Sequence, residues 1–216
     1  MVMKTPFTTE QFFEVFEKYN LAVFPGQIIL LAMGIAALLL IHSHKEYRNR
    51  LIAGFLGILW LWIGVVYHLS FFTSINKAAY GFGGLFILQG IFFFLETFRN
   101  RLAFAFEGTT KDYLGYVFMV FGLVIYPVVS FFLADSPAHT ISLGLPCPTT
   151  IYTFGLLMVT TSRFPKYLLI IPILWAIIGT GAALNFGVYQ DYVMLLAALI
   201  ASLYLFRRKR LTQGSL

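Results

Sequence analysis

His68 is a residue whose type and position could support chemistry. It stands inside a long apolar segment, where ionisable groups usually face protein or water and not lipid. An imidazole there can accept a proton, bind a metal or respond to pH. It can equally be a structural ring, hydrogen-bonded to a carbonyl or a tyrosine. The residues that share its helical face are Trp60, Gly64, Tyr67 and Phe71.

Cys147 is the second candidate, because it stands between Pro146 and Pro148. Two prolines around one residue remove backbone donors and disfavour regular helix, so the segment that follows is expected to begin with a break or a kink. The N–H groups of its first turn, with the hydroxyls of Thr149 and Thr150, could meet an anion. A small thiol packed in a structural kink is the plainer interpretation.

Metal binding is an alternative role for part of this set. The candidate ligands are His68, Cys147 and Asp191, a mixture of imidazole, thiolate and carboxylate that transition metals accept. Their spacing matches no ligand motif, so no cofactor is predicted and a transition-metal ion stays as the alternative. The sequence also has no nucleophile elbow, no His-Glu-x-x-His and no phosphate loop, which favours a protein that is not an enzyme.

Seven long apolar segments must position these residues. The chain has 216 residues, of which 59% are hydrophobic and 11% charged, whereas soluble domains carry about 25% charged residues. A helix needs about 20 mostly apolar residues to cross a bilayer, and continuous apolar runs favour helices over barrel strands. We therefore predict an all-α integral membrane domain over residues 21–210. Its spans are expected near 21–42, 51–72, 78–98, 113–133, 143–162, 167–187 and 189–206.

The basic residues predict an orientation for these spans. Most of the 15 lysines and arginines fall in every second gap, and cytoplasmic loops carry the excess of such residues. The N-terminus is thus expected outside, and residues 211–216 form a short cytoplasmic tail. The basic residues of these gaps are Lys45, Arg48, Arg50, Arg99, Arg101, Lys111, Arg163, Lys166 and Arg207 to Arg210.

Residues 1–20 are expected to form a short amphipathic helix on the outer face. Thr8 and Gln11 stand three apart, as in a capping box, and the apolar residues from Phe12 to Tyr19 recur at helical spacing. The helix is predicted to lie in the membrane interface or to cover the mouth of the bundle.

A weak internal repeat joins the first three spans to the last three. Trp60 precedes Gly64 by four residues in the second span, and Trp175 precedes Gly179 in the same way in the sixth. A parallel 3+1+3 repeat, with the fourth span as linker, is similar to the architecture of sugar-transporting SWEET proteins. The alternative is that such residues recur because they are common at membrane borders.

With this orientation, the polar residues of the spans gather in the outer half. We expect them to line an outward-facing pocket that binds or transports a small polar solute or ion. The alternatives are a membrane-embedded metal-dependent hydrolase and a non-catalytic assembly or sensing partner. The expected partners are the lipid bilayer and the solute, without nucleic acid, and an oligomer is compatible with the sequence. The predicted ligand-binding residues are His68, Tyr67, Tyr80, Gln27, Cys147, Thr149, Thr150 and Asn185.

Several stretches resemble an uncharacterised family of bacterial seven-span membrane proteins, known as domain of unknown function 6064. They include Pro6-Phe7-Thr8, Tyr19-Asn20 and Tyr67-His68, and the most specific is the run from Gly144 to Thr150. The resemblance covers most of the chain and implies a multi-pass protein of the bacterial inner membrane. It carries no known activity, so it transfers no catalytic residue.

Overall fold

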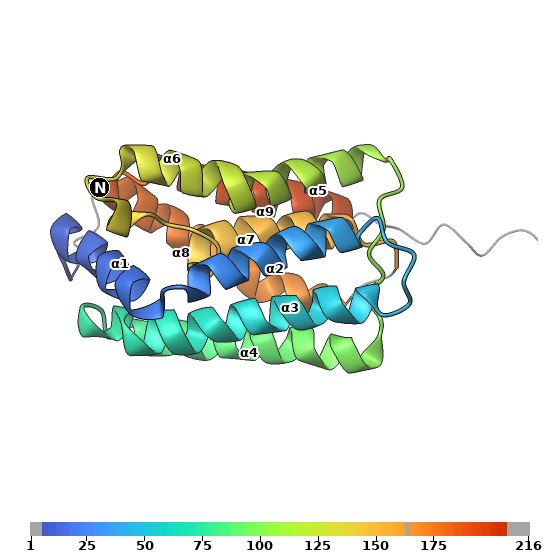
Figure 1. Cartoon of the computed structure of the whole chain (residues 1–216), viewed down its shortest axis with the longest axis horizontal. Helices are drawn as coiled ribbons and strands as arrows, with labels where there is room; N and C mark the ends of the chain where they lie inside the picture. Colours follow the sequence, from blue (N-terminus) through green and yellow to red (C-terminus); the bar gives the residue numbers. More distant parts are fainter. Residues whose placement is uncertain (1–5, 163–164, 207–216) are drawn as a thin grey trace, which may run out of the picture.

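The computed structural model describes residues 6–162 and 165–206, and these residues form a bundle of helices (Figure 1). The described part contains two isolated β-bridges and no strand. The predictions for Arg163, for Arg207 to Arg210 and for the tail at 211–216 lie outside the described residues.

The bundle is built from long helices, several of which are extended by π-helical or 3₁₀ turns. The first half of the chain contains α1 (Thr9–Val23), α2 (Gly26–Leu40), α3 (Arg48–Trp62), the π-helical η1 (Ile63–Leu69), the short η2 (Phe72–Ser74) and α4 (Ala79–Arg99). The second half contains α5 (Thr110–Val120), the π-helical η3 (Phe121–Ile125), α6 (Tyr126–Leu133), η4 (Pro137–His139), α7 (Pro146–Met158), η5 (Lys166–Leu169), α8 (Ile170–Phe186), η6 (Tyr189–Asp191) and α9 (Tyr192–Phe206).

Five helical stretches among the described residues are long and apolar enough to cross a membrane. They are Arg48–Ser74, Ala79–Arg99, Thr110–Leu133, Lys166–Phe186 and Tyr189–Phe206. The pair α1 and α2 passes the same test only when taken together, and it is bent by 84°. The all-helical fold and its membrane-type helices thus agree with the sequence, whereas the count of seven spans stays a prediction.

The predicted spans 21–42 and 143–162 both differ from a single straight helix. The first is divided at Pro25, which precedes α2, so that residues 21–23 belong to α1. Pro25 lacks an N–H and therefore cannot continue the hydrogen-bond pattern of α1. The second span contains α7, which has only 13 residues because residues 140–145 enter the bundle as non-helical chain (Figure 1).

Helix α7 is the centre of the bundle, and Cys147 is its only residue that is not buried. Gly155 of α7 lies directly against Gly115 of α5. A Cβ atom on Gly155 would stand 2.6 Å from the Gly115 carbonyl oxygen, and one on Gly115 would stand 2.8 Å from the oxygen of Gly155. Small residues at such a crossing let two helix backbones approach closely. On the other side, the Tyr152 hydroxyl donates to the Gly34 carbonyl of α2 at 2.8 Å.

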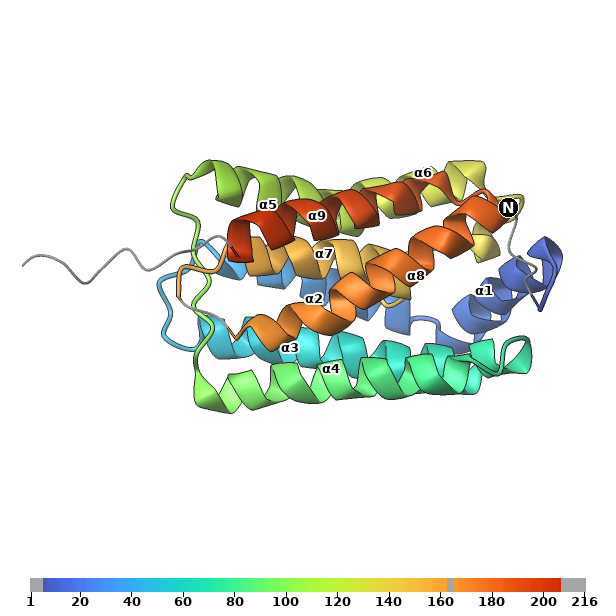
Figure 2. The same cartoon turned by 180° about the vertical axis from the view of Figure 1, so that it is seen from behind.

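The connections divide the bundle into two ends. The α2–α3, α4–α5 and α7–α8 connections lie at one end, which we name the basic end, and α1 lies at the opposite end, which we name the α1 end (Figures 1 and 2). The described basic residues beside these connections are Lys45, Arg48, Arg50, Arg99, Arg101, Lys111 and Lys166. The grouping of charges at one end agrees with the sequence, and the side of the membrane that this end faces stays a prediction.

The basic end is held together by backbone and side-chain bonds. Residue Ala105 donates its N–H to the Val159 carbonyl at 3.1 Å, and Thr161 donates to the Ala103 carbonyl at 2.8 Å. The buried Glu96 carboxylate accepts hydrogen bonds from Arg101 and, at 2.6 Å, from the Tyr167 hydroxyl. The bond to Glu96 raises the pKa of the Arg101 guanidinium.

The proposed 3+1+3 repeat has one local counterpart in the packing. Gly64 lies against Gly83 and Ile87 of the following helix, and Gly179 lies against Met194 of the helix that follows it. Glycine thus permits a close helix contact in both triplets. The repeat as a whole stays a prediction.

Candidate functional site

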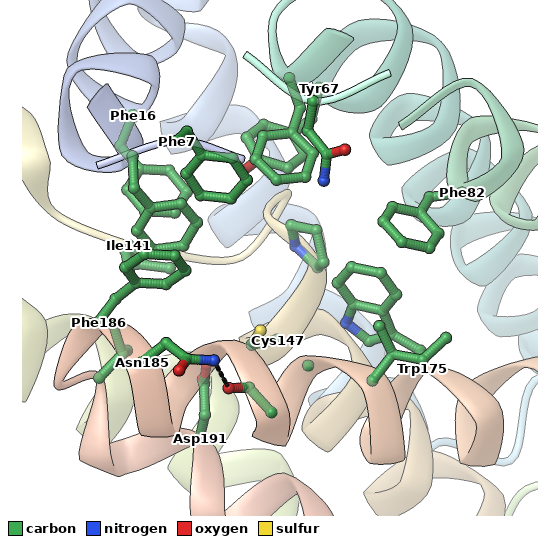
Figure 3. Close-up of a pocket in the computed structure, with 18 of the residues that line it drawn as sticks. Phe7, Phe16, Tyr67, Phe82, Ile141, Cys147, Trp175, Asn185, Phe186 and Asp191 are labelled. Carbon is green, nitrogen blue, oxygen red and sulfur yellow. Dashed lines mark hydrogen bonds between the residues drawn. The ribbon is translucent and has the colours of Figure 1, made fainter. Parts of the chain in front are cut away.

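A cavity of about 190 Å³ lies in the α1 end of the bundle (Figure 3). Its lining comes from the N-terminal segment with α1, from η1 and η2, from α4, from the start of α6, from the chain around Cys147, and from α8 and the turn after it. Most of these side chains are apolar, and the phenylalanines among them are Phe7, Phe12, Phe16, Phe72, Phe82 and Phe186. A concave, mostly apolar space with a few polar groups is the usual form of a small-molecule site.

Helix α1 and the residue before its cap form one wall of the cavity. The helix begins at a capping box, as the sequence predicts: the Gln11 side chain accepts from the Thr8 N–H at 2.9 Å, and the Thr8 hydroxyl accepts from the Gln11 N–H at 3.2 Å. This start directs Phe7 and Phe12 onto Phe186 of α8, with ring centroids 5.2 and 4.6 Å away. The amphipathic segment therefore covers part of the bundle with its aromatic face.

Residues 140–145 bring the chain from the α1 end into the bundle (Figure 1). Non-helical backbone at membrane depth must be buried in protein and bonded there. The Tyr19 hydroxyl donates to the Gly144 carbonyl at 3.0 Å, the Gly144 N–H donates to the Thr149 hydroxyl at 3.0 Å, and the Ile141 N–H donates to the Ser130 hydroxyl at 2.8 Å. Asn20 donates its side-chain N–H groups to the carbonyls of Ala138 and Thr140 at 2.6 and 2.9 Å.

Gly144 permits the non-helical path of residues 140–145. Its φ is +98°, a conformation that L side chains rarely adopt, and a Cβ there would lie 2.6 Å from Leu30. Because the segment ends inside the bundle, α7 starts there too, and Cys147 stands at the cavity instead of at the surface.

Several polar groups of the cavity gather around Cys147. The Tyr126 hydroxyl donates to Asp191 Oδ1 at 2.5 Å, and the Cys147 thiol lies within hydrogen-bonding reach of the same carboxyl group. The Trp175 indole nitrogen points toward Cys147 (Figure 3). That N–H is buried, and although the Cys147 thiol is within its reach, it makes no hydrogen bond of good geometry among the described residues.

Two π-helical segments carry tyrosines to this site. Tyr67 lies within η1, and Tyr126 follows directly after η3. A π-helical turn holds an extra residue, so it rotates the side chains that follow it, and such turns are frequent at functional sites. Both tyrosines line the cavity. Sequence reasoning missed Tyr126 and gave Trp175 no polar role, although both are polar aromatic residues within apolar segments.

The structure brings three of the predicted ligand-binding residues to this cavity, namely Tyr67, Cys147 and Asn185, together with the metal candidate Asp191. Asn185 donates its side-chain N–H to the Gly181 carbonyl at 2.8 Å (Figure 3).

Four other predicted residues have different surroundings. Thr149 bonds to Gly144 as described above, and the Thr150 hydroxyl donates to the Pro146 carbonyl at 2.8 Å, so both hydroxyls act within the start of α7. Gln27 donates to the Asn20 carbonyl at 2.7 Å. Tyr80 is 64% exposed on the surface of the bundle. None of the four lines the cavity.

His68 is fully buried behind the cavity, outside its lining. Aromatic rings surround it, with centroids 4.8 Å away for Phe86, 5.3 Å for Trp175 and 5.8 Å for Phe82. Neither ring nitrogen has a hydrogen-bond partner within the described part of the chain. The structural interpretation, an imidazole bonded to a carbonyl or a tyrosine, therefore has no such bond among the described residues, and a functional role for His68 stays a prediction.

The metal alternative lacks a complete ligand set in this arrangement. Cys147 and Asp191 are neighbours, whereas His68 packs against Trp175. Among residues 6–162 and 165–206, no group of three or more His, Cys, Asp and Glu side chains is placed to hold a metal ion.

The fold and the cavity define a class: an all-helical bundle with membrane-type helices and an aromatic cavity near one end. The chain belongs to a family of unknown function, DUF6064, whose family model matches residues 9–215. No curated protein and no solved structure matches the chain.

Proposed function

We propose that this protein is a membrane-embedded binding protein for a small, mostly apolar molecule about the size of one substituted ring. The observation that carries this proposal is the cavity of about 190 Å³ with aromatic walls and a cluster of polar groups around Cys147. For comparison, an engineered apolar cavity of about 150 Å³ binds benzene. The expected occupant is thus less polar than the solute or ion that the sequence suggested.

The charges around the cavity support a neutral occupant. Among the described residues that line it, none is a lysine or an arginine, and Asp191 is the acidic one. Moving an ion from water into apolar surroundings costs far more than moving an apolar ring, unless the ion finds a partner. A bare ion would therefore bind poorly beside these phenylalanines.

Binding is favoured over transport by the packing beyond the cavity. The side chains of Tyr152, Phe154, Leu156 and Met158 in α7 are all fully buried. Gly155 brings α7 into backbone contact with α5. A solute that crossed the bundle along α7 would have to open this close-packed region, whereas binding needs only the cavity.

The proposed placement in the membrane follows the charges. We propose that the basic end faces the cytoplasm and the α1 end faces outward, in a bacterial inner membrane. The seven predicted spans would then include the bent α1–α2 pair as one span, and α7 with its non-helical entrance as another. Under this proposal the cavity lies in the outer half of the bilayer.

The single cysteine of the sequence offers a direct test, because Cys147 lines the cavity. The protein, purified in lipid nanodiscs, would be treated with a neutral benzyl methanethiosulfonate or with its charged trimethylammonium-ethyl analogue, and adducts would be counted by mass spectrometry. We expect the neutral ring reagent to modify Cys147 well before the charged one. We also expect small ring compounds such as acetophenone to slow this modification.

Two variants serve as controls. Cys147→Ser should take up neither reagent, and Glu46→Cys in that background places a thiol in the exposed α2–α3 connection, where both reagents should react and ring compounds should not protect. Equal reaction of native Cys147 with both reagents would contradict the proposal. So would a Cys147 that reacts only after denaturation, or one that no ring compound protects.

A further inference from the structure

We infer that the cavity selects neutral ring compounds that carry a hydrogen-bond-accepting oxygen, and that the Trp175 indole N–H is the group that recognises this oxygen. The inference rests on the proposed function, since it names the chemical class of the cavity's ligand. It also assigns a specificity-determining role to Trp175.

The three tryptophans of the chain provide the first argument. The Trp60 N–H donates to the Thr153 hydroxyl at 3.1 Å, and the Trp62 N–H donates to the Tyr19 hydroxyl at 2.7 Å. The Trp175 N–H is buried without such a partner in the described structure. Buried N–H groups in proteins are nearly always bonded, so an orphaned one that lines a cavity indicates a partner that comes from outside the chain.

The Cys147 thiol does not replace that partner. The Trp175 nitrogen points toward the Cys147 thiol (Figure 3), and a thiol sulfur is only a weak acceptor. A ligand oxygen that took the place of the thiol at the N–H would give it a stronger bond. Carbonyl and ether oxygens on a small ring have this chemistry.

The Asp191 carboxyl group, which lines the cavity, already has donors from the protein. The Asp191 carboxyl group already accepts from Tyr126, and the Cys147 thiol lies within reach of it. The protein thus supplies donors to its own acceptor but supplies no oxygen to the Trp175 donor. A ligand that brings an acceptor completes the set, whereas an anion would meet the Asp191 carboxyl without a cation to compensate it.

The indole is held firmly enough to discriminate between ligands. Three rings pack edge-on against it: Phe86 at 5.0 Å, His68 at 5.3 Å and Phe82 at 5.4 Å between centroids. A donor fixed in this way rejects an analogue without the acceptor, because the N–H then stays buried and unbonded. Phe82 and Trp175 themselves line the cavity, so the same packing shapes the space beside the N–H.

The test compares acetophenone with α-methylstyrene, which replaces the carbonyl oxygen by a methylene group and keeps the shape. Protection of native Cys147 from the neutral thiol reagent would be measured against the membrane concentration of each compound in nanodiscs. We expect acetophenone to protect at a concentration about tenfold lower than α-methylstyrene, as one additional hydrogen bond to a buried donor implies. Benzoate should not protect at either concentration.

Trp175→Phe removes the N–H and keeps an aromatic ring, so it should abolish the preference while α-methylstyrene still protects. Trp60→Phe, whose indole is bonded within the protein, is the matched control and should keep the preference. Equal protection by the two compounds in the native protein would overturn the inference but leave the proposed binding site intact. If neither compound protected Cys147, the proposed function itself would be contradicted. Equal protection and absent protection are both measured on the native protein.

Discussion

Two sets of buried polar groups, one at each end of this bundle, differ in their hydrogen bonding. At the basic end, the buried Glu96 carboxylate is paired with Arg101, Arg99 and the Tyr167 hydroxyl. At the α1 end, the fully buried His68 ring has no hydrogen-bond partner in the described structure, and the Trp175 N–H has none either. A buried charge is compensated when it is paired and hydrogen-bonded. A buried polar group without a hydrogen bond lowers the stability of the fold unless another interaction compensates for it.

Packing differs between the same two regions. Toward the basic end, α7 touches α5 backbone to backbone at Gly155 and Gly115. Toward the α1 end, α7 begins at Cys147 beside a cavity of about 190 Å³. One helix therefore has a close backbone contact along its length and a cavity at its first turn. Under the proposed function, the cavity provides the space for a ligand, and the Trp175 N–H beside it provides a donor that has no oxygen partner in the described structure.

The largest expected effect is at the backbone contact between α7 and α5. Gly155→Ala would place a Cβ 2.6 Å from the Gly115 carbonyl oxygen, and backbone cannot give way as a flexible side chain can. We expect a loss of stability of about 3 kcal/mol, at the upper end of what overpacking costs. The measurement is the midpoint of thermal unfolding in detergent, with the yield of monodisperse protein from size exclusion.

Gly84→Ala is the matched control for this substitution. Gly84 lies in α4 with nothing within 4 Å of its would-be Cβ, so the change should be neutral or slightly stabilising. If Gly155→Ala and Gly84→Ala unfolded at the same temperature as the native protein, the α5–α7 contact would not be the tight region that the comparison requires.

Local features of the sequence were sufficient to predict several parts of this fold. The apolar runs predicted the helices from Arg48 to Ser74 and from Ala79 to Arg99 within a few residues, because a span of this kind depends on its own composition. The Thr8–Gln11 capping box and the break at Pro146 were also predictable, since both depend on neighbours in the chain. The grouping of basic residues at one end follows from the alternation of connections.

The direction of individual side chains was not predictable in the same way. In a membrane-type helix the outer face and the inner face are both apolar, so helical periodicity does not show which face is buried. Tyr80 was predicted to line a pocket and is exposed, whereas Trp175 lines the cavity with its N–H unbonded. The π-helical turns η1 and η3 rotate Tyr67 and Tyr126 by an amount that no local sequence signal indicates.

A smaller effect should separate two buried tryptophans. Trp60→Phe removes the bond to Thr153, whereas Trp175→Phe removes an N–H that has no partner in the described structure. Both changes lose a similar ring volume, so their difference isolates the hydrogen bond. We expect Trp60→Phe to cost about 1 kcal/mol more in free energy of unfolding than Trp175→Phe, measured on ligand-free protein. Equal losses of free energy of unfolding would mean that the two indole N–H groups are hydrogen-bonded to the same extent, which would contradict the comparison.

The smallest expected effect is at His68. Replacing this imidazole by the phenyl ring of His68→Phe removes two buried nitrogens that have no partner within residues 6–162 and 165–206. The new ring would keep the aromatic contacts with Phe86 and Trp175. Removing an unbonded polar group is nearly neutral or stabilising, so the free energy of unfolding should stay within about 0.5 kcal/mol of the native value or rise. A loss above about 1 kcal/mol would show that the imidazole is bonded in solution, as a bridging water would allow, and would place His68 with the satisfied polar groups of the basic end.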